Sequence, residues 1–157
     1  MRGRLFAALL ISAATTLPAS AAILSVTEAG SGELLARFPV KANGTWCVLW
    51  NHSVQGFEVS DCYQNRKGRM VLVRSHLPDF AAGLDHIPGR GRQLSDGMGG
   101  YWIEDIDEAV PGNSYVVRPG RYATVNHRIQ VAGQTFSISR VAEHDRVRIS
   151  LEPEPGK

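Results

Sequence analysis

Short runs in which apolar and polar residues alternate recur along most of the chain, broken by glycine, proline and asparagine. Alternation with a period of two is typical of strands buried on one face, whereas helical periodicity is almost absent here. The pattern therefore predicts an all-β fold: a single antiparallel β-sandwich, or an open barrel-like domain, built from hairpins.

Eight strands and three hairpin turns follow from this pattern. The turns are expected at Gly30-Ser31-Gly32, at residues 53–56 and at Ala132-Gly133. The strands are expected at 23–28, 33–40, 45–51, 57–63, 69–76, 123–131, 134–141 and 146–151.

One long stretch, residues 77–112, is rich in glycine and proline and shows a clear strand signal only around Tyr101-Trp102-Ile103. Structureless segments of this length are uncommon in compact domains and are usually functional or disordered. One interpretation is a surface excursion with a short strand or helical turn. The other is part of a binding site, using Asp85, His86, Arg90 and Arg92.

The hairpin around residues 53–56 contains both cysteines, and its register decides whether they can meet. A four-residue loop pairs His52 with Phe57, Val48 with Asp61, and Cys47 with Cys62. Directly opposed Cβ atoms lie about 4.5–5.5 Å apart, from which a small backbone adjustment allows a disulfide. A tighter turn would shift the pairing by one residue and send the cysteines to opposite faces. The first register is preferred because it gathers large apolar side chains on one face: Trp46, Val48, Trp50, Phe57, Val59 and Tyr63.

The N-terminus has the pattern of a secretory signal peptide over residues 1–21. Two arginines precede a short apolar stretch, and Ala19-Ser20-Ala21 supplies a cleavage site. The stretch is shorter than the roughly 20 residues that span a membrane, although an uncleaved anchor is the alternative. We therefore expect a periplasmic protein with one β domain at 22–151 and a flexible tail at 152–157. A disulfide, rather than two free thiols, fits such an oxidising compartment.

Cleavage would also change the charge of the chain. Of the 17 basic residues, Arg2 and Arg4 leave with the signal peptide, so 17 − 2 = 15 remain against 15 acidic residues. A neutral chain lacks the basic surface that nucleic-acid binding requires. We expect no nucleic-acid partner, and membrane contact only through a partner or an uncleaved anchor.

The residue types of a catalytic triad occur in the central hairpin, but the register separates them. Asp61 lies opposite Val48, four residues from His52, which places the two side chains roughly 13 Å apart. A hydrogen-bonded pair needs about 2.6–3.2 Å, so we expect no catalytic residues and no enzyme.

Metal and ligand sites have weak signals of their own. No histidine stands at a metal-ligand spacing, so no metal and no cofactor are expected, although His52, His127 and Asp85 from separate strands are left as an open combination. His127 falls on an apolar face, where a histidine bonded to a backbone carbonyl is more common than a ligand. The tryptophans either line a groove or pack in the core.

The run Trp50-Asn51-His52-Ser53-Val54, followed by Asp61-Cys62-Tyr63, resembles the domain-of-unknown-function family 1850. Members share an aromatic-x-His-Ser-Val motif, an acidic residue followed by an aromatic, a glycine-rich segment and a late strand with a histidine, here His127. The resemblance extends over residues 34–151. Asp61, where glutamate is more frequent, and the cysteine pair depart from the pattern.

The resemblance implies a context rather than a reaction. Such proteins are small, exported or anchored, and often encoded beside TAXI-type TRAP transporters for organic acids. It marks His52, Ser53, Asp61 and His127 as signature positions. The leading hypothesis is a non-enzymatic periplasmic accessory protein of such a transporter, with its membrane or binding subunits as partners. The alternatives are a small-ligand or metal-binding β module and, third, an enzyme of unknown reaction.

Overall fold

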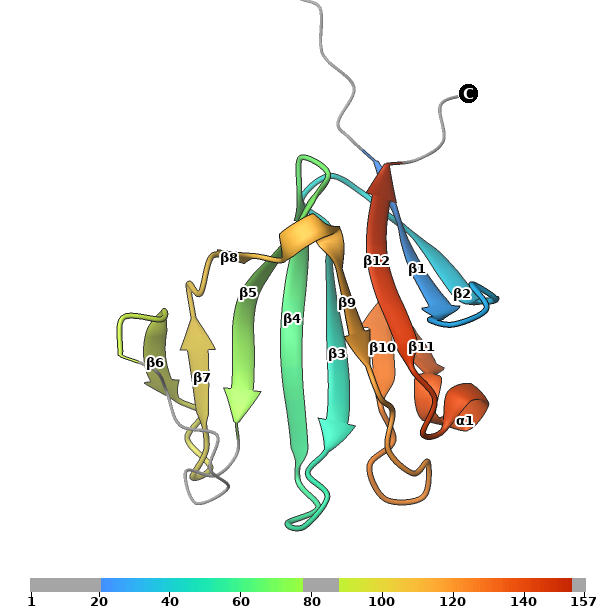
Figure 1. Cartoon of the computed structure of the whole chain (residues 1–157). Helices are drawn as coiled ribbons and strands as arrows, with labels where there is room; N and C mark the ends of the chain where they lie inside the picture. The colour runs from blue at the N-terminus through green and yellow to red at the C-terminus, as the bar shows by residue number, and fades with distance from the viewer. Residues whose placement is uncertain (1–20, 78–87, 154–157) are drawn as a thin grey trace, which may run out of the picture.

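Two antiparallel sheets face each other in the computed structural model, which describes residues 21–77 and 88–153 (Figure 1). The predicted signal peptide, apart from Ala21, lies outside the described residues, as do Asp85 and His86. The all-β sandwich is confirmed, and neither sheet closes into a barrel.

The smaller sheet has the strand order β2-β1-β12-β9. Its strands are β1 (Ala22–Glu28), β2 (Leu34–Val40), β9 (Ser114–Val117) and β12 (Val147–Pro153). The first and last strands of the domain are direct partners, with Ala22 opposite Pro153. Hence the two ends of the described domain lie at the same end of the molecule (Figure 1).

The larger sheet has the order β11-β10-β3-β4-β5-β7-β6, and β8 pairs beside β5. Its strands are β3 (Thr45–Asn51), β4 (Glu58–Arg66), β5 (Arg69–Leu77), β6 (Arg92–Ser95), β7 (Tyr101–Glu104), β8 (Glu108–Ala109), β10 (Arg128–Val131) and β11 (Gln134–Ser137). The glycine-rich stretch thus supplies β6, β7, β8 and a short 3-10 helix, η2 (Pro111–Asn113), in its described part.

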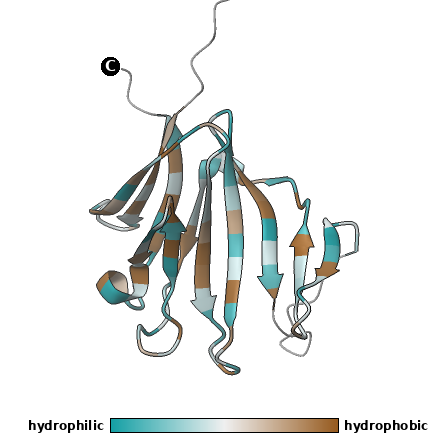
Figure 2. Ribbon diagram, turned by 180° about the vertical axis from the view of Figure 1, so that it is seen from behind, coloured by the Kyte–Doolittle hydropathy of each residue, from teal (hydrophilic) through white to brown (hydrophobic). Residues whose placement is uncertain are grey.

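The core lies between the inner faces of the two sheets. Alternate residues of each strand point inward, which gives the banded hydropathy seen along the ribbons in Figure 2. Leu24, Val26 and Ile149 from the smaller sheet and Ile129 from the larger one are fully buried. Phe38 and Phe136 meet across the gap, with ring centroids 6.2 Å apart.

The register predicted for the central hairpin is confirmed. Trp50 pairs with Val59, and Cys47 pairs with Cys62, whose Cα atoms are 4.0 Å apart and which form a disulfide. The turn itself closes with hydrogen bonds from the His52 N–H to the Phe57 carbonyl (2.7 Å) and from the Gly56 N–H to the His52 carbonyl (2.8 Å).

The C-terminal hairpin has the predicted pairing but shorter strands than expected. Ile129 lies opposite Phe136, yet the second strand ends at Ser137 and continues as α1 (Ile138–Ala142). The Ser137 side chain caps this helix by accepting a hydrogen bond from the Arg140 N–H at 3.2 Å, which favours the turn over continued strand. Residues 123–127 likewise belong to the loop before β10 rather than to a strand.

The predicted tail also needs a correction, because β12 runs on to Pro153. Glu152 and Pro153 pair with β1, whereas β9 pairs only with residues 147–150 of β12. Beyond Ser150 the strand therefore has a neighbour on one side only, where a proline without an N–H is tolerated. Residues 154–157 lie outside the described residues.

Candidate functional site

A hollow of about 220 Å³ opens between the two sheets, where β9 faces β3 and β4. Its walls are aromatic and aliphatic, with one carboxyl and one imidazole group among them. The lining residues are Val48, Trp50, Asp61, Tyr63, Tyr115, Val116, Val117 and His127. Two of these, Asp61 and His127, are positions that the sequence had marked as candidates.

Asp61 reaches this inner face because of the register of β4 against its neighbours. It lies opposite Val48 on one side and Ser75 on the other. Tyr63, two residues further along the same strand, faces inward as well, and the bulge beside it adds its extra residue, Val73, on β5. The strand therefore presents a carboxyl group and a phenol side by side to the gap between the sheets.

The environment of the Asp61 carboxyl favours its neutral form. Burial raises its pKa above the ordinary value of 3.8, and this effect outweighs the hydrogen bond that it accepts from the Ser75 hydroxyl at 2.5 Å. Arg90 acts in the same direction as that hydrogen bond, while Glu108 opposes it. A carboxyl with a raised pKa, held in a hollow, is the kind of group found at binding and catalytic sites.

Tyr63 and Tyr115 extend the polar part of the hollow across the gap between the sheets. Their rings stack with centroids 5.6 Å apart. Burial, and then the nearby Asp61, raise the pKa of Tyr63 to about 12, and burial raises that of Tyr115 well above 10.0. The Tyr115 hydroxyl is buried next to that of Tyr63, but within the described residues it finds no partner of hydrogen-bond geometry.

A second hollow, of about 210 Å³, lies on the other side of the tyrosine pair. Tyr63 and Tyr115 line both hollows, and Arg90 and Glu108 line the second one, where the Arg90 guanidinium pairs with the Glu108 carboxylate at 2.8 Å. Because the same two tyrosines line both hollows, we treat the hollows together and name them the inter-sheet site.

The opposite end of the inter-sheet site is formed by His127, which is held as a neutral imidazole. Burial, and then the neighbouring Arg128, lower its pKa below 6.5. Its Nδ1 accepts a hydrogen bond from the Gly120 N–H at 3.2 Å, which leaves the proton on Nε2. The ring stacks on Trp50 with centroids 5.8 Å apart. The expected bond to a backbone carbonyl is thus replaced by a bond from a backbone amide.

Glycine is required at position 120 for this arrangement. A Cβ atom on Gly120 would lie 2.8 Å from the Cβ of Val125, which is too close for van der Waals contact. The loop before β10 folds tightly on itself here, and that approach brings the Gly120 amide to the imidazole of His127.

His52 and Ser53, the other candidates, do not reach the inter-sheet site. The Nδ1 atom of His52 accepts a hydrogen bond from the Gln55 N–H at 3.2 Å, and its ring stacks on Phe57. Ser53 is exposed in the same turn. His52 therefore shapes the β3–β4 turn, while Asp61 and His127 come together in the site.

The structure also places a histidine–aspartate pair that sequence reasoning missed. The Nε2 of His76 lies 2.9 Å from Oδ2 of Asp96, and the other carboxylate oxygen, Oδ1, accepts hydrogen bonds from the N–H groups of Met98 and Gly100. The Met98 N–H, and then His76, hold the Asp96 pKa below 3.8. His76 lies on β5 and Asp96 follows 20 positions later in the glycine-rich stretch, so no local sequence pattern indicated the pair.

The three tryptophans have different surroundings. Trp46 is 1% exposed and belongs to the core, whereas Trp50 lines the inter-sheet site. Trp102 packs against His76 and carries the guanidinium of Arg74 over its ring at 4.6 Å from the centroid. Only Trp50 thus fits the groove-lining interpretation.

Residues 21–77 and 88–153 contain no group of three or more His, Cys, Asp or Glu side chains that could hold a metal ion, and no helix that is both long and apolar enough to cross a membrane. The combination of His52, His127 and Asp85 includes a residue outside that part of the chain. The inter-sheet site offers hydrogen-bonding groups between aromatic walls, which suits a small ligand.

Comparison with known proteins gives one finding. A family model described as Domain of unknown function (DUF1850) matches residues 47–138. The match covers a shorter span than the 34–151 expected, and it contains Asp61, Tyr63, Tyr115 and His127. No curated protein and no solved structure matches the chain.

Proposed function

The chain belongs to the DUF1850 family, and from that premise we propose that it is an exported, non-enzymatic binding module that takes a small ligand into the inter-sheet site. The observation that carries the proposal is the partly buried position of the Asp61 carboxyl beside Tyr63 and Tyr115. Burying a carboxyl group costs stability unless it is fully compensated, and an apolar side chain would fill the same place more cheaply.

The chemistry of the site narrows the ligand. Trp50, Tyr63 and Tyr115 offer aromatic surfaces, and neutral His127 offers a hydrogen-bond donor at Nε2. The pKa of Asp61 is raised, so this carboxyl takes up a proton more readily than an exposed aspartate does and can then donate as well. A protonated carboxyl donates well to a carboxylate, and Arg90 adds a positive charge, although it is paired, beyond the tyrosines. We therefore propose a small organic acid as the ligand.

The proposed setting is the periplasm, in association with the membrane or binding subunits of a TAXI-type TRAP transporter. The resemblance noted from the His-Ser-Val run supports this setting, and the Cys47–Cys62 disulfide fits an oxidising compartment.

Ligand binding is tested by titrating the protein with a panel of organic acids, including succinate and benzoate, and recording NMR chemical shifts. A true ligand gives saturable shifts at the Trp50 indole and at residues 115–117. Tyr115→Phe, which removes one buried hydroxyl, should weaken binding, whereas Tyr122→Phe, at an exposed tyrosine outside the site, should not. A panel with no saturable shift would overturn the proposal.

The transporter setting is tested separately. The tagged protein should co-purify from solubilised membranes with the transporter subunits encoded near it, and mixing purified components should restore the association. If the protein neither co-purifies with the subunits from solubilised membranes nor associates with the purified subunits on mixing, the transporter setting is wrong. The result of the ligand titration does not depend on this outcome.

A further inference from the structure

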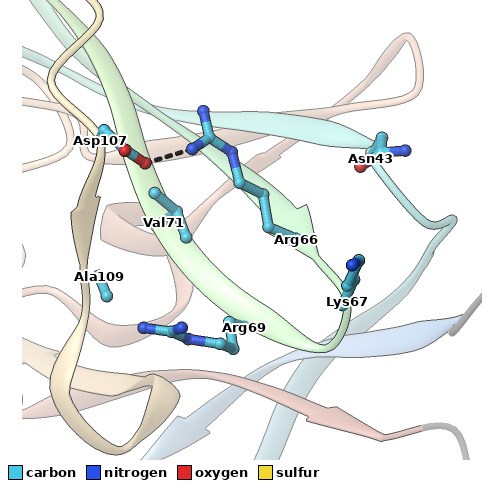
Figure 3. Close-up of a pocket in the computed structure, with 7 residues that line it drawn as sticks. All are labelled: Asn43, Arg66, Lys67, Arg69, Val71, Asp107 and Ala109. Carbon is cyan, nitrogen blue, oxygen red and sulfur yellow. Dashed lines mark hydrogen bonds and ion pairs between the residues drawn. The ribbon is translucent and has the colours of Figure 1, made fainter.

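A second concave surface lies on the outer face of the larger sheet, and it shares only Ala109 with the lining of the inter-sheet site. Arg66, Lys67 and Arg69 of the β4–β5 hairpin border a groove of about 460 Å³, and Asp107 and Ala109 border it on the other side (Figure 3). Its floor includes Val71, which points to the face opposite that of its core neighbours Met70 and Leu72. We name this surface the hairpin groove.

The charge of the hairpin groove is positive even after its internal ion pair is counted. Arg66 pairs with Asp107 and donates from Nε to the Gln64 side chain at 2.8 Å. Within the described residues, neither Lys67 nor Arg69 has a salt-bridge partner, and both are exposed. Two cationic groups are therefore left to face a concave space large enough for a small molecule.

The backbone around the groove is held firmly in place. Asn65 is fully buried, and its side-chain oxygen Oδ1 accepts a hydrogen bond from the Gly68 N–H at 2.8 Å. Asn113 bridges the hairpin from the far side, donating to the Gly68 carbonyl at 2.7 Å and accepting from the Met70 N–H at 2.9 Å. These bonds fix the strand ends that carry Arg66 and Arg69 before any ligand arrives.

Lys67 occupies a backbone conformation that lysine rarely adopts. Lys67 and Gly68 form the two-residue turn between β4 and β5, with φ values of 55° and 80°. A turn with positive φ at both positions favours Asn-Gly. Asn43 and Asp107, which also line the groove, have positive φ values of 59° and 53°. Strained residues of this kind cluster at functional sites, and the lysine provides a charge that asparagine would lack.

We propose that the hairpin groove binds a small oxyanion, carboxylate or phosphate, through Lys67 and Arg69, with Arg66 held alongside by Asp107. A guanidinium group donates to such an anion through paired N–H bonds, and an ammonium group adds a compact charge. The groove lies at the end of the domain from which both chain ends emerge, so a phospholipid headgroup is a second possible source of the same chemistry (Figure 1).

The test uses two loss variants and a matched control. Lys67→Asn removes the charge and installs the residue that the turn prefers, so its melting temperature should stay the same or rise. Arg69→Gln removes the second charge. Arg37→Gln makes the same change at an exposed arginine on β2, in the smaller sheet.

Binding of inorganic phosphate and of succinate is measured by NMR titration at constant ionic strength, with chloride as the reference salt. The wild type and Arg37→Gln should show saturable shifts at residues 66–69, none of which lines the inter-sheet site. Each loss variant should weaken the affinity by about tenfold, since a charge-assisted hydrogen bond is lost. No saturable shift in the wild type, or equal weakening in Arg37→Gln, would overturn the proposal.

Phosphatidylglycerol and phosphatidylcholine vesicles form the second arm of the test. Binding of both the soluble anions and the anionic vesicles, lost together in Lys67→Asn, supports one oxyanion site that accepts either source. Binding of anionic vesicles alone would replace the small-molecule site with a membrane-contact surface. Because the variants leave the inter-sheet site intact, the result is independent of the function proposed above.

Discussion

Removing the disulfide gives the most direct test of how the central hairpin stabilises the domain. Cys47 is partly exposed and Cys62 is 3% exposed, so Cys47→Ser removes the cross-link while leaving a small apolar thiol in the buried position. Cys62→Ser removes the same cross-link and also buries a hydroxyl group. The first variant isolates the effect of the cross-link, and the second adds a desolvation cost.

The magnitude follows from the spacing of the two residues. The cysteines are 15 residues apart, and closing a loop of that length in the unfolded chain is worth about 3 kcal/mol in the chain-entropy model. For a domain of this size that corresponds to a fall in melting temperature of roughly 10 °C for Cys47→Ser. Cys62→Ser should lower the free energy of unfolding by about 1–3 kcal/mol more than Cys47→Ser does.

The assay is thermal unfolding followed by circular dichroism, with and without a reducing agent. Reduction should bring the wild type down to the level of Cys47→Ser and leave that variant unchanged. Hydrogen exchange should also speed up at residues 52–57, which form the turn of the loop closed by the disulfide. A wild type that melts at the same temperature in both conditions, with exchange at the turn unchanged, would refute the reasoning.

Three further predictions concern single polar side chains. The pKa of Asp61 is raised in the folded state, so its contribution to the free energy of unfolding is favourable below pH 3.8 and is lost as pH rises through the folded pKa. Asp61→Asn should therefore raise the melting temperature at pH 7 and give no gain at pH 3. An equal change in melting temperature at the two pH values would contradict this. Glu28 has a pKa shifted the other way: the N–H groups of Ser31 and Gly30 lower it to about 2. The stabilising effect of its carboxylate should therefore disappear as pH falls from 4.5 towards 2. An NMR titration of its carboxyl carbon with a midpoint near 4.5 would refute the lowered pKa. Asn65→Ala removes the side-chain amide that donates to the Val40 and Lys41 carbonyls, and it should lower the free energy of unfolding in urea by about 1–3 kcal/mol or more. Gln64→Ala, at a partly exposed neighbour, should lower it by less.

The parts of the structure that the sequence predicted are those set by local spacing. Two residues that face each other across a short turn are fixed by the length of that turn, so the pairing of Cys47 with Cys62 followed from counting. The same counting put Asp61 opposite Val48, on the face shared by Trp50 and Tyr63. That was the signal for a carboxyl group among aromatic side chains.

The parts that could not be predicted depend on distant segments. Ser75 and Tyr115 approach Asp61 only after β5 and β9 have taken their places, and neither position carries a pattern of its own. The helix α1 was missed because Ile138 alternates with polar neighbours as a strand residue would. What ends the strand is the hydrogen bond at Ser137, supported by the Ser139 hydroxyl that accepts from the His127 N–H at 2.8 Å.

The pairing of β1 with β12 also sets the order in which this domain can be completed. The first strand of the domain stays without one of its two neighbours until the last strand has arrived, more than a hundred residues later. Contacts of such long sequence separation slow folding. During synthesis, which starts at the N-terminus, the edge of β1 stays exposed until β12 has been made. A chain that stops short of β12 would keep that edge open, so this domain depends on its final strand to protect it from aggregation.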